Sequence, residues 1–498
     1  MEKNRMSYVL MALAPCLVMS FMLFTSDAKG LLVTGGVFAA ALLYYLIVRF
    51  RFMLLAAAIA VMAFCPFYFG IQAGGLPKIY ADNIIYFTYI IYFFILYVII
   101  RQKRPYLGDA PLAMALGLFF LAHAISFVFN PTASIPARNF FETYFLGIIL
   151  LYIFLIEVEQ KNIDLIINVI VFTTFVLSVL VIAEKVAGYN PIMDAAPKDF
   201  SYITPEQAAQ VRGVYRPYAT FFSPSEAGTF IAMGIPFIVY RMYSFRWPLA
   251  VVLLGASSAA IVLNYTRGVW IALALTGLIF IRRLRLIAAV LAPAAVLGGT
   301  VLAMTMRDNP FVQRLFDPAN LLNRFFYWDI ALNIFGDNML MGIGHMKFKD
   351  MYLKFVRGVD ATVSVDIKQV FVPDNIFLTT LIEHGLFGFI ALTGLIVFVF
   401  LRLRSLRTGL AQAGDTANEN LVKACGMGLS IYILAGLLAD VHLFTKATKF
   451  CFIIMGVAFS VAKGRHFLYG GASRAVKKRA SEGCDVKKEA CAIKELPL

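Results

Sequence analysis

Apolar residues form long unbroken stretches along most of the chain, and short polar connections separate them. An α-helix crosses the hydrocarbon core of a bilayer, about 30 Å thick, with about 20 apolar residues. The pattern predicts about fourteen transmembrane helices and hence an all-α, polytopic membrane protein. The predicted spans cover residues 7–25, 31–48, 52–70, 83–100, 111–129, 139–157, 163–184, 220–240, 247–264, 267–281, 286–304, 375–400, 422–439 and 447–462.

Basic residues in the connections indicate the orientation, because Lys and Arg collect in short cytoplasmic loops. A cytoplasmic N-terminus places Arg49 and Arg51, residues 101–104, residues 282–285 and the basic tail inside, whereas the outer connection 71–82 is nearly free of basic residues. The first stretch also has signal-peptide features, but we interpret it as the first helix because further spans follow. Both termini are expected in the cytoplasm, with the protein in a bacterial inner membrane.

Composition agrees with this picture. The 498 residues are 61% hydrophobic and 15% charged, whereas soluble domains average about 45–50% apolar and about 25% charged residues. The net charge of +15 lies in short clusters between the spans, so we expect no nucleic-acid partner. The six cysteines are scattered and match neither a disulfide framework nor a zinc site.

Two outer segments are long, and such loops are usually functional. The predicted organisation is helices over 1–184, a periplasmic loop over 185–219, helices over 220–304, a large periplasmic loop over 305–374, helices over 375–462 and a basic cytoplasmic tail over 463–498. An apolar stripe between residues 321 and 334 of the large loop predicts an amphipathic helix. It could lie on the outer leaflet or pack on the transmembrane bundle.

Several arginines lie on the outer side, where the positive-inside pattern disfavours them. Arg267 follows a very short outer connection, and Arg212 and Arg216 precede the span that starts near residue 220. Guanidinium groups bind phosphate bidentately, so the three could share an anionic ligand. Alternatively, Arg267 anchors a helix end and the other two lie in a solvated loop.

Other polar residues lie at or near the next predicted span. Asp374 precedes Asn375 at its start, where Asp could cap the helix, act as a general base, or do both. Glu383 and His384 follow about 13 Å further along, where a buried hydrogen bond and a role in a cavity are both possible. His345 lies in the large outer loop. Known metal and nucleotide motifs are absent from the outer side, so neither metal nor cofactor is expected.

Three segments resemble the O-antigen ligase and O-antigen polymerase superfamily of membrane glycosyltransferases. They are Thr266-Arg267-Gly268, then Arg324 and Trp328 followed by Gly342-Ile343-Gly344, and finally Asp374-Asn375 with Gly385 and Gly388. The last is similar to the family pattern His-Asn-x9-Gly-x-x-Gly. Asp374 stands where ligases have His, which favours a polymerase over a ligase.

The resemblance implies a GT-C-like fold around a cavity open to the outer leaflet. The donor would be a glycan on undecaprenyl diphosphate and the acceptor a second glycan, with a chain-length regulator and a flippase as candidate partners. Asp374 would be the base of an inverting, metal-independent transfer, and Arg267, Arg216, Arg212 and Arg324 would bind the diphosphate. Asn375, Glu383, His384 and His345 would support the site.

Two alternatives stay open. A ligase would transfer the finished glycan to lipid A core or to protein. A transporter of lipid-linked glycans would carry internal repeats and charges near the bilayer midplane; no convincing repeat is visible, although Glu383 and His384 fit the second feature.

Overall fold

A computed structural model of the chain describes residues 50–66, 70–71, 79–99, 110–130, 139–194, 210–211, 214–242, 247–280, 319–357, 373–439 and 445–463. These residues are helical apart from connections and two short pairs of strands. The expected all-helical architecture is therefore confirmed for the described part of the chain. Arg212 and the predicted spans 7–25, 31–48 and 286–304 lie outside it.

The first half of the chain contributes apolar helices and one strand pair. In order they are a helix over Phe50–Phe64, β1 (Gly70–Ile71), β2 (Ile79–Tyr80), α3 (Ala81–Phe93), the π-helix η1 (Phe94–Ile99), α4 (Ala110–Phe129), the π-helix η2 (Phe141–Phe145), α6 (Leu146–Glu157), α7 (Ile163–Ala187) and α8 (Pro191–Asp194). β1 and β2 pair antiparallel.

The remaining elements include α17, the longest helix that the structure describes. They are β3 (Gln210–Val211), β4 (Val214–Tyr215), α10 (Pro224–Arg241), α11 (Trp247–Leu263), α12 (Arg267–Phe280), α15 (Ala319–Asp337), α16 (Phe348–Arg357), α17 (Ile376–Gln412), α18 (Thr416–Gly436) and α19 (Thr445–Ser460). β3 and β4 also pair antiparallel.

Helices occupy the positions of the predicted spans that the structure describes. Three of the described helices are long and apolar enough to cross a bilayer by themselves, namely Ala110–Phe129, Ile163–Ala187 and Ile376–Gln412. The total of about fourteen spans stays a prediction.

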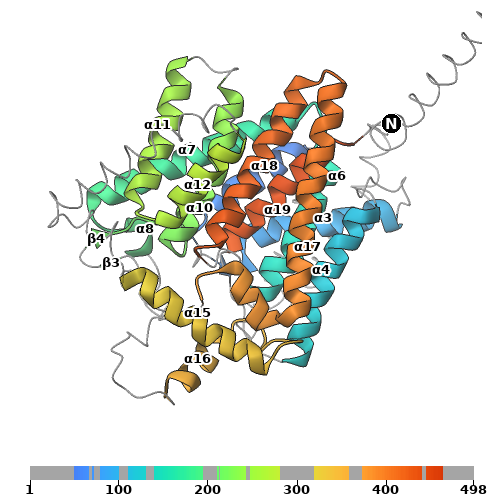
Figure 1. Cartoon of the computed structure of the whole chain (residues 1–498). Helices are drawn as coiled ribbons and strands as arrows, with labels where there is room; N and C mark the ends of the chain where they lie inside the picture. Colours follow the sequence, from blue (N-terminus) through green and yellow to red (C-terminus); the bar gives the residue numbers. More distant parts are fainter. Residues whose placement is uncertain are drawn as a thin grey trace, which may run out of the picture.

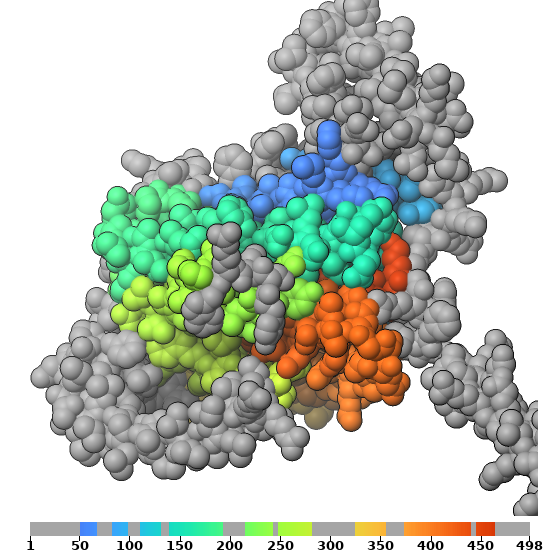
Figure 2. All heavy atoms as spheres, turned by 90° about the horizontal axis from the view of Figure 1, so that it is seen from above, coloured from blue at the N-terminus to red at the C-terminus, as the bar shows by residue number. Residues whose placement is uncertain are grey.

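The bundle is organised around α10, α18 and α19. α19 packs on α6 and α18, α10 contacts α7, α11 and α18, and α17 runs beside α4 and α18. In Figure 1, α11, α17 and α18 run upright, α7 crosses obliquely, and α15 and α16 lie below them. Figure 2 shows from above that α6 and α7, in teal, lie between the blue N-terminal helix and the green and orange helices.

α15 forms where the apolar stripe predicts a helix. Ile330, Ala331 and Ile334 are buried in a small second core with Tyr352 of α16 and Ile382 of α17. The helix therefore packs against α16 and the start of α17. Other apolar side chains of α15 are exposed, and its placement on the outer leaflet stays a prediction.

α17 is broken near its start, whereas the sequence predicted one continuous helix. Gly385 has φ +66° and ψ −168°, outside the helical region. The Leu386 N–H donates to the Met339 carbonyl, and the Ile343 N–H donates to the Ile382 carbonyl. The loop after α15 thus contacts the break, and Glu383 and His384 end the short helical segment that precedes it.

Candidate functional site

The segment that carries Arg216 is fixed by a buried carboxylate of α7. Glu184 accepts hydrogen bonds from the Tyr215 hydroxyl at 2.6 Å and from the backbone N–H groups of Tyr218 and Ala219 at 3.1 and 2.6 Å. Lys185, the next residue, donates to the Tyr215 carbonyl at 2.7 Å. The end of α7 therefore holds the Arg216 backbone at a defined place.

The Arg216 side chain reaches the turn between α11 and α12. Its Nη2 donates to Thr266 Oγ1 at 3.0 Å, and its Nε lies 3.4 Å from the Asn264 carbonyl. Asn264 in turn donates to the Pro217 carbonyl at 2.8 Å. These contacts bring Arg216 beside Arg267, the first residue of α12.

Arg267 occupies an electrostatically unusual position. A helix N-terminus carries partial positive charge and free N–H groups, so it favours anions and disfavours a cation. A guanidinium at this place, with Arg216 docked on the preceding turn, concentrates positive charge. Such a concentration suits a phosphate or diphosphate group.

Asp374 lies opposite this positive charge, at the entrance to α17. Its Oδ2 is 3.5 Å from Nη2 of Arg324 on α15, and its side chain is 46% exposed. The backbone of Asp374 is left-handed, with φ +55°, a conformation that Asp adopts more readily than most residues. The Trp328 indole donates to the Pro373 carbonyl at 2.8 Å, so α15 also holds the residue before Asp374.

Asn375 is the N-cap of α17. Its Oδ1 accepts from the N–H groups of Phe377 and Leu378 at 3.0 and 3.1 Å. The capping role that the sequence allowed for Asp374 therefore belongs to its neighbour. The Asp374 carboxylate is left to face the arginines.

The charges around Asp374 act on its acidity in opposite directions. Desolvation by the surrounding protein raises the pKa of Asp374, while the positive charges of Arg324 and Arg216 lower it, and desolvation prevails. Arg216 is thus near enough to influence the carboxylate. Asp374, Arg324 and Arg216 form one group, with Arg267 next to Arg216; we call these four residues the arginine–aspartate site.

An apolar cavity begins beside this site. Ile376 and Thr380, in the first turns of α17, are part of its wall. The rest of the wall comes from α4 and η2, with His123 and Tyr144, and from α17, α18 and α19. The polar atoms that reach its surface are few. A hydrocarbon chain could occupy such a space.

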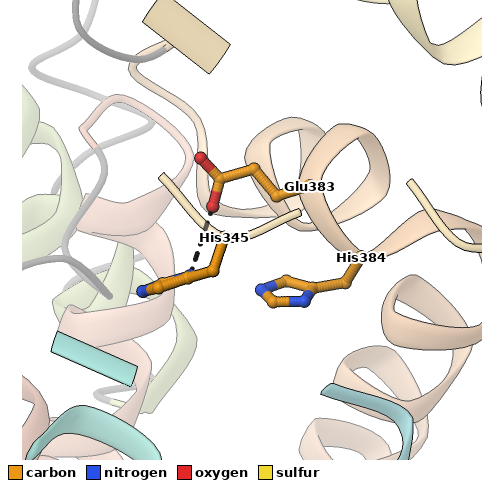
Figure 3. Close-up of side chains that lie close together, drawn as sticks. All are labelled: His345, Glu383 and His384. Carbon is orange, nitrogen blue, oxygen red and sulfur yellow. Dashed lines mark ion pairs between the residues drawn. The ribbon is translucent and has the colours of Figure 1, made fainter. Parts of the chain in front are cut away.

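The remaining sequence-predicted residues gather elsewhere. His345, Glu383 and His384 are fully buried and lie together at the break in α17 (Figure 3). They are separated from Asp374 by the short helical segment, which extends about 13 Å between positions 374 and 383.

Sequence reasoning missed the buried groups that support the site. Glu184, Glu226 and Lys446 are each less than 9% exposed. Glu226 accepts from the N–H groups of Phe222 and Lys446, and Lys446 Nζ donates to the carbonyls of Cys65 and Thr220. The sequence could have indicated them, because charged residues inside or at the ends of apolar spans usually have buried partners.

Comparison with known families finds a match over part of the chain. Residues 249–393 match the family model described as O-antigen ligase. The matched part extends from α11 into α17 and contains Arg267, Arg324 and Asp374, whereas Arg216 precedes it. No curated protein matches the chain. This match supports a resemblance to the O-antigen ligase and polymerase superfamily over that part of the chain, and the long apolar helices indicate a membrane protein.

Proposed function

We propose that the protein polymerises oligosaccharide repeats carried on undecaprenyl diphosphate, at the periplasmic face of the inner membrane, into O-antigen or exopolysaccharide. The observation that carries this proposal is the Asp374 carboxylate, released from helix capping by Asn375 and placed beside Arg324 and Arg216. A carboxylate next to positive charge can deprotonate a hydroxyl while a neighbouring group holds an anion.

The reaction is a single displacement at the anomeric carbon of the donor sugar. An acceptor hydroxyl attacks this carbon, and Asp374 takes the hydroxyl proton. The bond between the anomeric carbon and the diphosphate oxygen breaks, and undecaprenyl diphosphate leaves with the bonding electrons. Attack opposite to the leaving group inverts the configuration.

The arginines stabilise the negative charge that develops on the leaving diphosphate. Arg216 and Arg267 lie at the N-terminus of α12, where the helix dipole adds to their charge. Arg324 holds Asp374 in place and supplies a further donor. Because guanidinium groups can neutralise the diphosphate, the scheme requires no metal at the reacting phosphates.

The apolar cavity supports a lipid-linked donor. Its wall includes Ile376 and Thr380, within two turns of Asp374, and is almost wholly apolar. Part of the polyprenyl chain would occupy this cavity while its diphosphate contacts the arginines.

A ligase is the second candidate, favoured by the family description, O-antigen ligase. The two functions differ in acceptor, since a polymerase uses another lipid-linked repeat. A deletion strain separates them: single lipid-linked repeats accumulate without a polymerase, and long lipid-linked chains accumulate without a ligase. Accumulation of long chains would reject the polymerase proposal.

The catalytic assignment is tested with Asp374→Asn in that strain. We expect polymer formation to fall by about 10²–10⁴-fold, the usual contribution of a general base, with unchanged protein in the membrane. Asp350→Asn, the same chemical change at an exposed position of α16, is the control and keeps full activity. Wild-type polymer from stably inserted Asp374→Asn would remove Asp374 from the mechanism.

A further inference from the structure

Three buried side chains converge at the break in α17, away from the arginine–aspartate site. His345 comes from the loop after α15, and Glu383 and His384 end the short helical segment. One nitrogen or oxygen atom of each lies within 4.8 Å of the others, and all three residues are fully buried. Figure 3 shows the side chains of Glu383 and His384 pointing from one helix toward His345.

The hydrogen bond on the far side of His345 fixes its tautomer. His345 Nε2 lies 2.9 Å from Asn139 Oδ1, and Thr143 also donates to that oxygen. Since Oδ1 only accepts, Nε2 must carry the hydrogen, and in a neutral ring Nδ1 then presents its lone pair. Nδ1 faces Glu383 Oε2 at 3.3 Å (Figure 3). The Nδ1 lone pair and the Glu383 carboxylate are both acceptors, so this contact is favourable only if a proton or a metal cation lies between them.

The buried carboxylate of Glu383 also requires a compensating positive charge. Among the described residues, neither carboxylate oxygen has a hydrogen-bond partner, and an uncompensated buried carboxylate is costly. A proton shared with His345 would give Oε2 a hydrogen bond but would leave Oε1 without one. A divalent cation compensates the whole carboxylate and also accepts the lone pair of Nδ1.

Hydrogen bonds and close packing fix the backbone around the cluster. Ser126 of α4 shares its hydroxyl proton between the carbonyls of Met341 and Glu383, at 2.8 and 2.9 Å. The Gly344 N–H donates to the Glu383 carbonyl at 2.9 Å. A Cβ atom on Gly342 would lie 2.5 Å from the Glu383 carbonyl carbon, so the two segments can approach this closely only with glycine. Ligand-bearing segments held in this way form a preorganised site.

A fourth possible donor lies next to the cluster. The rings of His123 on α4 and His384 are 4.4 Å apart between centroids. His123 Nδ1 lies 2.8 Å from the Phe119 carbonyl and donates to it, which leaves the Nε2 lone pair free for a metal.

We propose that His345, Glu383 and His384 bind a divalent transition metal of the Zn²⁺ class, with His123 as a neighbouring fourth donor. Two or three imidazoles with one carboxylate match the ligands that Zn²⁺ takes, and the Asn139 contact is the outer hydrogen bond typical of a metal-bound imidazole. Binding draws the ligand atoms inward to bonds of about 2.0–2.2 Å.

The proposed metal has a structural role. It would join α4, the loop after α15 and the short segment of α17 that begins beside Asp374. It lies about 13 Å along the helix from the transferring groups and takes no part in the sugar transfer. The inference therefore does not depend on the choice between polymerase and ligase.

The test uses the full-length protein purified with a histidine-free affinity tag. We expect mass spectrometry of the elements to find about one Zn²⁺ per chain, and expect Glu383→Gln and His345→Gln to lose at least nine-tenths of it. Glu157→Gln removes another buried carboxylate, at the end of α6 beside Arg51, and should keep the metal.

A second measurement covers variants that fail to fold. Wild-type protein is stripped with a chelator, and Zn²⁺ is added back while the melting temperature is recorded. We expect the melting temperature to rise until one equivalent is bound. Wild-type protein that neither contains Zn²⁺ nor is stabilised by it would overturn the proposal, and so would equal metal in wild type and Glu383→Gln.

Discussion

At the scale of single residues, Asp374 and Asn375 have different roles. One caps α17 and the other contacts an arginine, and sequence patterns cannot tell which residue does which. Both Asp and Asn are good N-caps. In the structure Asn375 accepts the first N–H groups of α17, and the left-handed Asp374 faces Arg324. The Asp-Asn pair thus combines one residue that caps the helix with one whose carboxylate faces Arg324.

The acidity of Asp374 leads to a pH prediction. Its raised pKa means that the basic form is lost, and activity falls, at a higher pH than for an ordinary carboxyl of about 3.9. Arg324→Gln removes a charge that lowers this pKa, so the acid limb of the rate profile should move to still higher pH. The measurement is the transfer rate against pH in proteoliposomes.

Arg404→Gln is the matched control for this experiment. It removes a positive charge from an exposed position near the other end of α17. Its acid limb should coincide with that of the wild type. An unchanged profile in Arg324→Gln would mean that Asp374 is not the titrating base.

Arg216 provides a second prediction at this scale. Removing one preorganised donor from a developing anion usually lowers the rate by about 10²–10³-fold. We expect a loss of this size in Arg216→Ala and a smaller one in Arg216→Lys, because Lys keeps the charge but not the fork of donors. Comparison of the transfer rates of the two variants at saturating donor tests this, and equal losses in both would argue against charge stabilisation by Arg216.

At the scale of elements, the broken α17 joins α15, the loop after it and α4 at one end of the bundle. The sequence predicts the helix from its apolar length, but the break depends on backbone contacts with a loop some forty positions earlier. In the sequence, Gly385 stands out only as the first glycine of the Gly-x-x-Gly segment that resembles the family pattern. In the structure it has positive φ, and a Cβ atom would lie 2.1 Å from the Leu340 carbonyl oxygen.

Gly385→Ala should therefore destabilise the protein by at least about 1–3 kcal/mol, since it adds backbone strain to a steric clash. Gly394→Ala is the control in the same helix, because a Cβ atom added there would have no neighbouring atom within 4 Å and Ala favours helix by about 1 kcal/mol. Thermal unfolding of detergent-solubilised protein should lower the midpoint for the first variant only. A similar decrease in both would contradict the role of the break.

At the scale of the whole molecule, the sequence predicts which segments are helices and on which side the arginines lie, because both depend on local patterns. Pairings between distant helices cannot be predicted in this way. Glu184 with Tyr215, and His345 with Glu383, are ordinary polar residues until the fold brings them together. A metal search by spacing fails for the same reason, since position 345 lies far from 383 and 384 in sequence.

The ion pair between α3 and α19 tests how such pairings hold the bundle together. Lys449 Nζ lies 2.7 Å from Asp82 Oδ2 and 3.1 Å from Asn83 Oδ1, in contacts that join residues 367 and 366 positions apart. Both charged side chains are almost fully buried. Removing one partner leaves the other charge buried and uncompensated, which typically lowers the free energy of unfolding by about 3–5 kcal/mol. Replacing both partners with neutral groups costs much less. Lys449→Met and Asp82→Asn should each lower the melting temperature strongly, and the double variant should recover much of the loss. A double variant as unstable as the sum of the single ones would mean that the two charges act independently.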